Sequence, residues 1–152
     1  MKNPWMSFHI YVLFTVFSGC TSPGVGLVDG ALRPCPKSPN CVVSLNGDEK
    51  HAIEPIVYQG DRDAAKARIR KIVSDYKGAT IVREEDGYIH AEFKTRIMRF
   101  VDDVEFLFPL DEQVIHIRSA SRVGYGDLGA NRKRMENIRT LFAQSSPKEE
   151  SR

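Results

Sequence analysis

The stretch "YIHAEFKTRIMRFVDDVEFLFPLDEQVIHIRSAS" (88–121) decides the fold, because apolar and polar residues alternate through most of its length. Alternation with a period of two is typical of β-strands that are buried on one face. Strands are predicted over 88–96, 98–109 and 114–121, with a turn at 110–113 between the last two. Short connections between consecutive strands favour an antiparallel sheet.

A strand and a helix are predicted before this stretch. Residues 51–58 alternate well enough to form a strand. A helix follows, with Asp61 or Asp63 as its N-cap and Gly78 as the residue that ends it. The apolar side chains of this helix recur at helical spacing. They are Ala65, Ile69, Ile72 and Tyr76.

Residues 79–85 supply a further strand, which a turn at Asp86 and Gly87 joins to the next strand in a hairpin. Residues 131–143 form the last element, an amphipathic helix. The apolar face of this helix contains Met135, Ile138, Leu141 and Phe142. The order β-α-β-β-β-β-α predicts an α+β fold in which two helices cover one face of an antiparallel sheet. This order resembles the TATA-binding-protein-like and helix-grip architectures.

The alternation also assigns the strand side chains to two faces of the sheet. The face expected beneath the helices contains Ile89, Ala91, Phe93, Phe100, Val104, Phe106, Phe108, Ile115 and Ile117. The opposite face contains Tyr88, His90, Glu92, Lys94, Asp103, Glu105, His116 and Arg118. We expect this second face to be solvated. Asp102 falls on the apolar face, so it is expected to be paired, to lie at an irregularity of the strand, or to be functional.

The N-terminus is typical of an exported chain. Residues 1–19 read as a signal peptide, since the apolar block at 10–17 is too short to span a bilayer. The residues that follow the block, Ser18, Gly19 and Cys20, resemble a bacterial lipobox in which Cys20 is acylated. Thr21 then favours the outer membrane, with the domain facing the periplasm. The alternative is an ordinary signal peptide and a soluble periplasmic or secreted protein with a free Cys20 thiol.

The rest of the chain divides into three parts. Residues 20–32 are expected to be a flexible, lipid-anchored tether, and 144–152 a disordered polar tail. Between them, 33–143 form a single domain.

Two further cysteines, Cys35 and Cys41, stand six residues apart in a proline-rich segment. Export to an oxidising compartment favours a structural disulfide between them. A redox-active pair is the alternative. A metal site would require two more ligands, and the segment does not supply them.

The charge of the chain argues against nucleic acid as a partner. The formal net charge is +2, and loss of Lys2 with the signal peptide lowers it to +1. A nucleic-acid-binding domain ordinarily has a basic footprint. The signs are nevertheless unevenly placed, because 101–112 is acidic and 118–139 is basic.

The segment "GYGDLG" (124–129) matches the G-x-G-x-x-G pattern of dinucleotide-binding loops. Such a loop requires a further parallel strand after its helix, and here the helix is the last element. We therefore predict a glycine-permitted turn, with Asp127 as a candidate N-cap of the final helix. Arg122 and Arg132 beside the turn either bind an anion or pair with the carboxylates of 102–105, and the sequence leaves both open.

Four stretches together resemble a known family: "CPKSPNC" (35–41), "GYIHAEF" (87–93), "VDDVEF" (101–106) and "RSASRVGYGDLGANRKR" (118–134). The family is domain of unknown function 1499, and the resemblance covers about residues 33–143. It implies a small single domain that is often exported or membrane-attached, without an established activity. The residues that match its polar signature are Asp102, Asp103, Glu105, Arg118, Ser119, Ser121, Arg122, Asp127, Asn131 and Arg134.

Three hypotheses for function follow. The first is a lipid-anchored envelope protein that binds a small anionic or lipid-like ligand, or an envelope protein, where the acidic strand meets the basic strand–turn–helix. The second is a metal-dependent or acid–base hydrolase that uses His90, Glu92 and His116. The third is a structural or assembly protein. We expect no cofactor and no resident metal.

Overall fold

The computed structural model describes residues 24–145. The predicted signal peptide, the predicted acylation site Cys20 and the tail beyond residue 145 lie outside the described residues. None of the described helices is long and apolar enough to cross a membrane.

Four long strands form the predicted antiparallel sheet. They are β5 (Ala79–Glu85), β6 (Tyr88–Lys94), β7 (Val101–Leu107) and β8 (Val114–Ser121). Consecutive strands are neighbours, so the sheet runs β8-β7-β6-β5 with antiparallel register throughout. The register of β5 against β6 shifts between Ile81 and Arg83, which places Val82 at a bulge. This meander confirms the α+β class and the antiparallel sheet.

Two short strands share the outer edge of β8. β3 (Cys41–Val43) pairs with its C-terminal half, where Cys41 lies opposite Ala120. β4 (Ile56–Val57) pairs with its N-terminal half, where Ile56 lies opposite Ile115. The predicted strand over 51–58 is thus reduced to two residues, and β3 was not predicted.

The two helices begin where local hydrogen bonds satisfy their first N–H groups. α1 (Arg62–Asp75) has Asp61 as its N-cap, and the carboxylate of Asp61 accepts a hydrogen bond from the backbone N–H of Ala64 (2.7 Å). α2 (Ala130–Gln144) follows Gly129, which adopts a left-handed conformation with φ of 77°. Asp127 lies three residues before Ala130, the first residue of α2, and its carboxylate accepts a hydrogen bond from the backbone N–H of Asn131 (2.8 Å). Asp127 therefore satisfies a donor at the start of α2, although Gly129 occupies the cap position.

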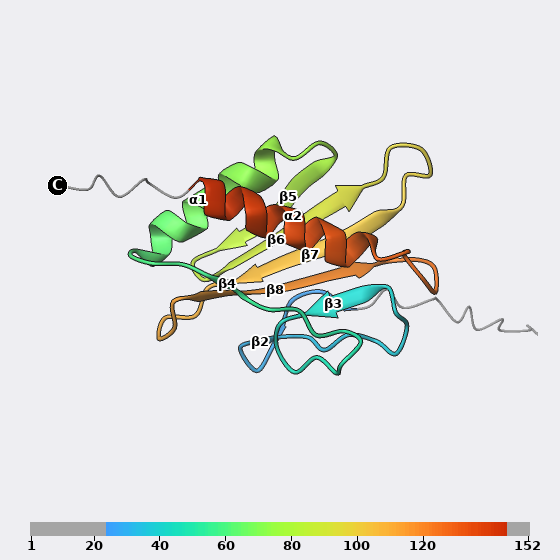
Figure 1. The fold of residues 1–152 in the computed structure, drawn as a ribbon, viewed down its shortest axis with the longest axis horizontal. Helices are drawn as coiled ribbons and strands as arrows, with labels where there is room; N and C mark the ends of the chain where they lie inside the picture. Colours follow the sequence, from blue (N-terminus) through green and yellow to red (C-terminus); the bar gives the residue numbers. More distant parts are fainter. Residues whose placement is uncertain (1–23, 146–152) are drawn as a thin grey trace, which may run out of the picture.

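Both helices lie on one face of the sheet, and α2 crosses the strands diagonally (Figure 1). The core between the two layers confirms the predicted inward residues of β6, β7 and β8. It contains Ala65, Ile69 and Val73 of α1, Met135, Ile138 and Phe142 of α2, and Ile89, Ala91, Phe93, Val104, Phe106, Phe108, Ile115 and Ile117. Two predicted core residues differ. Leu141 lies at the margin of the helix face and Phe100 lies outside β7, so both are exposed.

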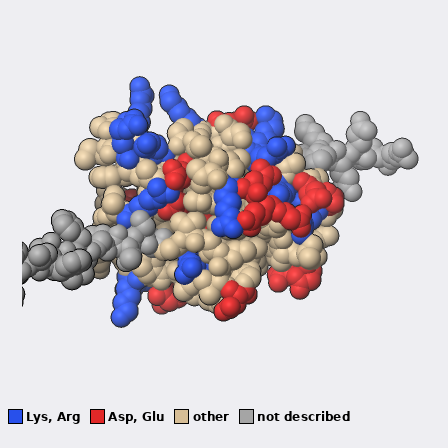
Figure 2. Space-filling view, turned by 180° about the vertical axis from the view of Figure 1, so that it is seen from behind, with Lys and Arg blue, Asp and Glu red and all other residues tan. Residues whose placement is uncertain are grey.

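Most of the opposite face of the sheet is covered, contrary to our expectation, although Lys94 at its end is exposed. Tyr88, Asp103, Glu105 and Arg118 on this face are each at most 2% exposed. Residues 24–40, which include a small hairpin of β1 (Leu27–Val28) and β2 (Ala31–Leu32), pack against it. Residues 24–32 were expected within a flexible tether, yet Leu32 is buried with Val43 and Tyr88. The outer surface of this side mixes acidic and basic side chains (Figure 2).

Gly78 links α1 to the sheet and lies close to the end of β6, which allows a test of the contact between this connection and the sheet. Its φ is 86°, and a Cβ at this position would lie 2.7 Å from the carbonyl oxygen of Lys94. Gly60 has a similar φ of 89°, but a Cβ there would meet nothing within 4 Å. The two glycines therefore share a backbone requirement and differ in the space around them.

We expect Gly60→Ala to lower the free energy of unfolding by about 1–2 kcal/mol, the cost of a left-handed conformation. Gly78→Ala has the same conformational cost and must also displace the backbone of β6, so we expect it to lower the free energy of unfolding by a further amount of about 1–3 kcal/mol. Urea unfolding followed by circular dichroism measures both variants. Equal losses would contradict the close approach of Gly78 to β6.

Candidate functional site

The ten residues of the predicted polar cluster extend from the middle of β7 and β8 to the end of the sheet where β8 leads into α2. β7 supplies Asp102, Asp103 and Glu105; β8 supplies Ser119, Ser121 and Arg118; the following loop and α2 supply Arg122, Asp127, Asn131 and Arg134. Because side chains alternate along β7 and β8, the sheet divides the cluster into two groups. One group faces α2, and the other faces the N-terminal segment.

The group beneath α2 is organised by Asn131, which is fully buried. Its amide nitrogen donates to the carbonyl of Asn40 (2.9 Å), to Oγ of Ser121 (3.0 Å) and to Asp127 (2.7 Å). Its amide oxygen accepts from Arg134 (2.7 Å). One side chain thus joins α2 to β8 and to the segment before β3.

Arg134 supplies the partner that Asp102 requires on the apolar face. Its guanidinium forms an ion pair with Asp102 and donates to Oγ of Ser119 (3.0 Å). It also lies over the ring of Phe93, with its central carbon 5.1 Å from the ring centroid. Of the three alternatives for Asp102, the structure shows pairing.

On the other face, Glu105 is completely buried, and its carboxylate accepts hydrogen bonds from three donors. Arg118 donates from Nη1 to Oε2 (2.6 Å), and the hydroxyl of Tyr88 donates to Oε1 (2.6 Å). The backbone N–H of Gly26 also donates to Oε1 (2.8 Å). Burial and the adjacent Glu105 carboxylate raise the pKa of Tyr88, so its hydroxyl stays protonated and donates.

Asp103 forms a second buried centre on the same face. Arg122 donates to both of its oxygens (2.9 and 2.7 Å), and Nε2 of His90 lies 2.7 Å from Oδ1. Burial raises the pKa of Asp103, but the hydrogen bonds from Arg122 and His90 outweigh it and hold the pKa below its ordinary value. Arg122 also pairs with Glu92, and the two carboxylates raise its pKa.

The arginines around the glycine turn are thus engaged by the protein itself. Arg118, Arg122 and Arg134 each pair with a carboxylate, and Arg132 donates to the carbonyls of Lys50 and Ala52. Of the two interpretations that the sequence left open, ion pairing describes Arg122, whereas Arg132 contacts backbone carbonyls instead of the carboxylates of 102–105. Within the turn, Gly124 and Gly129 adopt positive φ, whereas Gly126 does not.

The histidines proposed for a hydrolase are not brought together. His90 and His116 lie on β6 and β8, with β7 between them and with different cross-strand partners on it. Ser44 lies beside His116, and burial lowers the pKa of His116. Over residues 24–145, no group of three or more His, Cys, Asp or Glu side chains is arranged to hold a metal ion.

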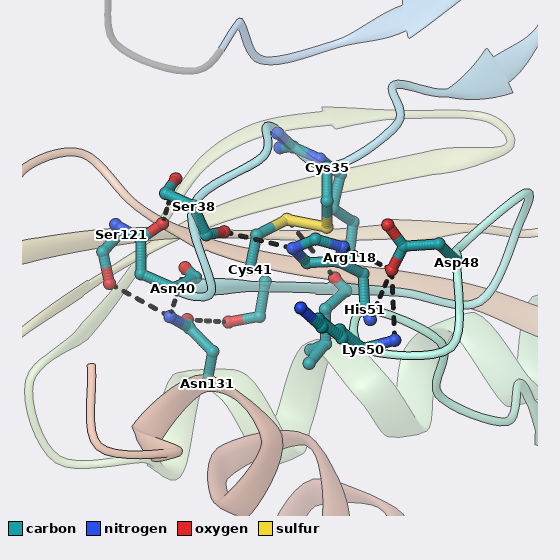
Figure 3. Close-up of a disulfide and its surroundings, with 12 residues drawn as sticks. Cys35, Ser38, Asn40, Cys41, Asp48, Lys50, His51, Arg118, Ser121 and Asn131 are labelled. Carbon is teal, nitrogen blue, oxygen red and sulfur yellow. Dashed lines mark hydrogen bonds and ion pairs between the residues drawn. A yellow bond between two sulfur atoms is a disulfide. The ribbon is translucent and has the colours of Figure 1, made fainter. Parts of the chain in front are cut away.

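The disulfide between Cys35 and Cys41 is present and closes the loop before β3. Figure 3 shows this loop beside Arg118, with Asn131 reaching Asn40 and Ser121. Ser38 within the loop donates its hydroxyl hydrogen bond to Asn40 (2.8 Å). The disulfide therefore closes the segment through which Asn40 contacts Asn131.

The described surface also contains a long groove on the helix side that sequence analysis did not predict. Its wider part, about 1070 Å³, lies between α2 and the ends of α1 and β6. A second part of about 730 Å³ continues between α1 and α2, and both parts are lined by Tyr76 and Lys77. Phe93 and Tyr76 meet edge to face in the wider part, with ring centroids 5.2 Å apart. Ile72 and Leu141 line the narrower part.

Four cations line the groove without an ion pair among residues 24–145. They are Lys77, Lys94, Arg96 and Lys133. The acidic residues of the lining are already paired, Asp75 with Lys71 and Glu136 with Arg139. The groove thus combines apolar walls with an uncompensated basic rim.

A family profile described as protein of unknown function (DUF1499) matches residues 31–142, most of the chain. The chain belongs to the DUF1499 family. No curated protein matches the chain significantly. In this DUF1499 protein the matched residues include the disulfide, both polar groups and most of the groove lining, whereas β1 precedes the matched region.

Sequence analysis did not identify some of the residues and partners in these sites, and the reasons are physical. Tyr88 was placed on the correct face, but only the structure shows that Glu105 is its partner. Asn40 lies inside the cysteine loop and acts through its backbone carbonyl, which leaves no trace in the sequence. The groove is assembled from three elements far apart in the chain, so no local pattern reveals it.

The buried pair of Arg118 and Glu105 gives a stability prediction. Arg118→Met leaves the Glu105 carboxylate buried without its cation, and we expect a loss of about 3–5 kcal/mol in the free energy of unfolding. Adding Glu105→Leu removes the uncompensated charge and recovers most of this loss, although Tyr88 and Gly26 each lose an acceptor.

Lys71→Met is the matched control, because it breaks an exposed pair with Asp75. Its expected cost is below about 1 kcal/mol. Urea unfolding under oxidising conditions compares the three variants. A similar loss for Arg118→Met and Lys71→Met would mean that Arg118 does not neutralise a buried charge.

Proposed function

We propose that this protein is an exported, lipid-anchored envelope protein whose domain binds an amphiphile with an anionic head group in the groove between α1, α2 and the end of β6. The observation that supports this proposal most strongly is the groove, in which apolar walls lie beside four cations that form no ion pair within residues 24–145. Apolar walls favour burial of an alkyl or aromatic body, and the cations favour a negative head group.

The two ends of the groove suggest how such a ligand would lie. Ile72 and Leu141 line the narrow part between the helices, where they suit an acyl chain. Lys94, Arg96 and Lys133 line the wide part, where they suit a phosphate or carboxylate. The groove is open along its length, so the ligand would rest across the surface rather than inside a closed cavity.

Export is supported by independent features of the chain. The disulfide between Cys35 and Cys41 suits an oxidising compartment. The apolar block at 10–17 and the lipobox-like "SGC" at 18–20 support a signal peptide and acylation of Cys20. On this proposal the domain faces the periplasm from the bacterial outer membrane. We also propose that the fold is related to the helix-grip architecture, because two helices lie on one face of the antiparallel sheet.

Titration with dodecyl phosphate tests the groove. We expect the full-length chain carrying Cys20→Ser to bind dodecyl phosphate more tightly than dodecyltrimethylammonium, as measured by isothermal titration calorimetry. Replacing Lys77 and Lys133 together by Gln removes two of the four cations. This change should weaken binding of dodecyl phosphate by about threefold to tenfold, the size of two exposed charge interactions.

Lys37→Gln is the control for this experiment, because Lys37 lies in the cysteine loop outside the groove lining. It should leave the affinity unchanged. Equal affinity for the cationic and anionic detergents, or equal loss in the control, would refute an anionic ligand in the groove.

The anchor is tested separately in a bacterial host. Wild-type protein should fractionate with the outer membrane and have the mass of a chain that begins at an acylated Cys20. Cys20→Ser should release it from the membrane fraction, because no acyl chain can be attached. Unchanged fractionation and mass would exclude the anchor while leaving the groove proposal intact.

A further inference from the structure

Exposed apolar side chains concentrate at one end of the sheet. Two loops meet there: residues 95–100 between β6 and β7, and residues 122–129 between β8 and α2 (Figure 1). The backbone N–H of Arg122 donates to the carbonyl of Val101 (3.1 Å), so the two loops start side by side. Their exposed apolar residues are Ile97, Met98, Phe100, Val123, Tyr125 and Leu128, half of the large exposed apolar residues in 24–145.

The first loop holds its apolar residues at a closed apex. The N–H of Thr95 donates to the carbonyl of Phe100 (2.8 Å), and the N–H of Phe100 donates to Oγ1 of Thr95 (2.9 Å). These bonds tie the base of the loop. Ile97 and Met98 lie between them and are 88% and 67% exposed. Their exposure is therefore a property of the folded loop, and no residue within 24–145 covers them.

Basic side chains flank this apex. Lys94 and Arg96 precede Ile97, and Arg99 follows Met98. None of the three side chains forms an ion pair with any residue that the structure describes. Lys and Arg side chains project at the upper left of Figure 2, the end that carries this loop. An apolar apex with a basic collar is complementary to an anionic bilayer, whose interface takes up apolar side chains and attracts cations.

We infer that the end of the domain formed by residues 95–100 and 122–129 docks on an anionic phospholipid membrane, with Ile97 and Met98 inserted into the interface. Tyr125 on the second loop suits the head-group level, where tyrosine is enriched. The inference shares Lys94 and Arg96 with the proposed ligand groove, but Ile97, Met98, Arg99 and residues 122–129 lie outside the groove lining. It also stands without the acyl anchor, because it needs no residue before Gly24.

A second copy of the chain fits this end less well. A twofold contact would bring the basic collar of one loop against the same collar of its partner, and like charges there repel. A membrane surface with anionic head groups presents the opposite sign across its whole area.

A tryptophan reporter tests the docking. The full-length chain with Trp5→Phe and Cys20→Ser contains no tryptophan and accepts no acyl chain. Met98→Trp in this background places a probe at the apex. Leu110→Trp is the matched control, because Leu110 is 85% exposed and lies in the β7–β8 connection at the other end of the sheet. Vesicles of equal phosphatidylglycerol and phosphatidylcholine, with brominated acyl chains, serve as quencher.

We expect emission of the tryptophan at position 98 to shift to shorter wavelength and to be quenched, and emission at position 110 to be unaffected. Arg99→Gln and Arg96→Gln should each raise the lipid concentration at half-maximal quenching by about fivefold, the effect of one basic residue near an anionic surface. The Met98→Trp protein with both arginines intact should bind vesicles of phosphatidylcholine alone more weakly than either arginine variant binds the anionic vesicles.

Three outcomes would overturn the inference. The probe at position 98 could stay unquenched, or the probes at 98 and 110 could be quenched alike, which would mean that the apex is not the part that inserts. A shift of the probe at 98 that depends on protein concentration without lipid would assign this end to self-association. The Lys77→Gln/Lys133→Gln variant separates the two proposals, because it should weaken dodecyl phosphate binding and leave quenching at position 98 unchanged.

Discussion

A carboxylate buried within the domain is the constraint on which the rest of the structure depends. Glu105 is removed from water, so its charge must be met inside the protein. Its three donors come from β8, from β6 and from the backbone at Gly26. The last of these recruits residues 24–40 to the sheet as a cover. A buried ion pair contributes little net stability, but it allows few arrangements of the chain around it.

The same principle operates on the other face through Asn131 and Asp102. Their partners join α2, β8 and the segment before β3 at the end of the sheet where β7 begins. This end is therefore polar and hydrogen-bonded on both faces, whereas the middle of the sheet is apolar only on the helix face. The two loops that project from this end start from a fixed base. A rigid base is the condition under which exposed loops can present side chains in a defined arrangement.

Alternation along the strands predicted the sheet, its two faces and the position of Asp102 on the apolar face, because all three follow from periodicity and burial. It also predicted a solvated second face, and here the pattern misled. Polar residues at every second position look the same whether water or a polar segment covers them, so Tyr88 and Arg118 gave no sign of their burial. Strands as short as β3 contain too few residues to show a period. The groove depends on how α1 and α2 lie on the sheet, which no single stretch encodes.

The strand β5 has a consequence for how two copies of the domain can meet. Among the described residues it pairs only with β6, so its other side offers unpaired backbone groups. Such an edge is a template on which a strand from another molecule can add. Here the bulge at Val82 interrupts the register, and Arg83, Glu84 and Glu85 place charges along the edge. The edge is therefore a poor template, and the open side of the sheet is protected against aggregation by its own irregularity and charge.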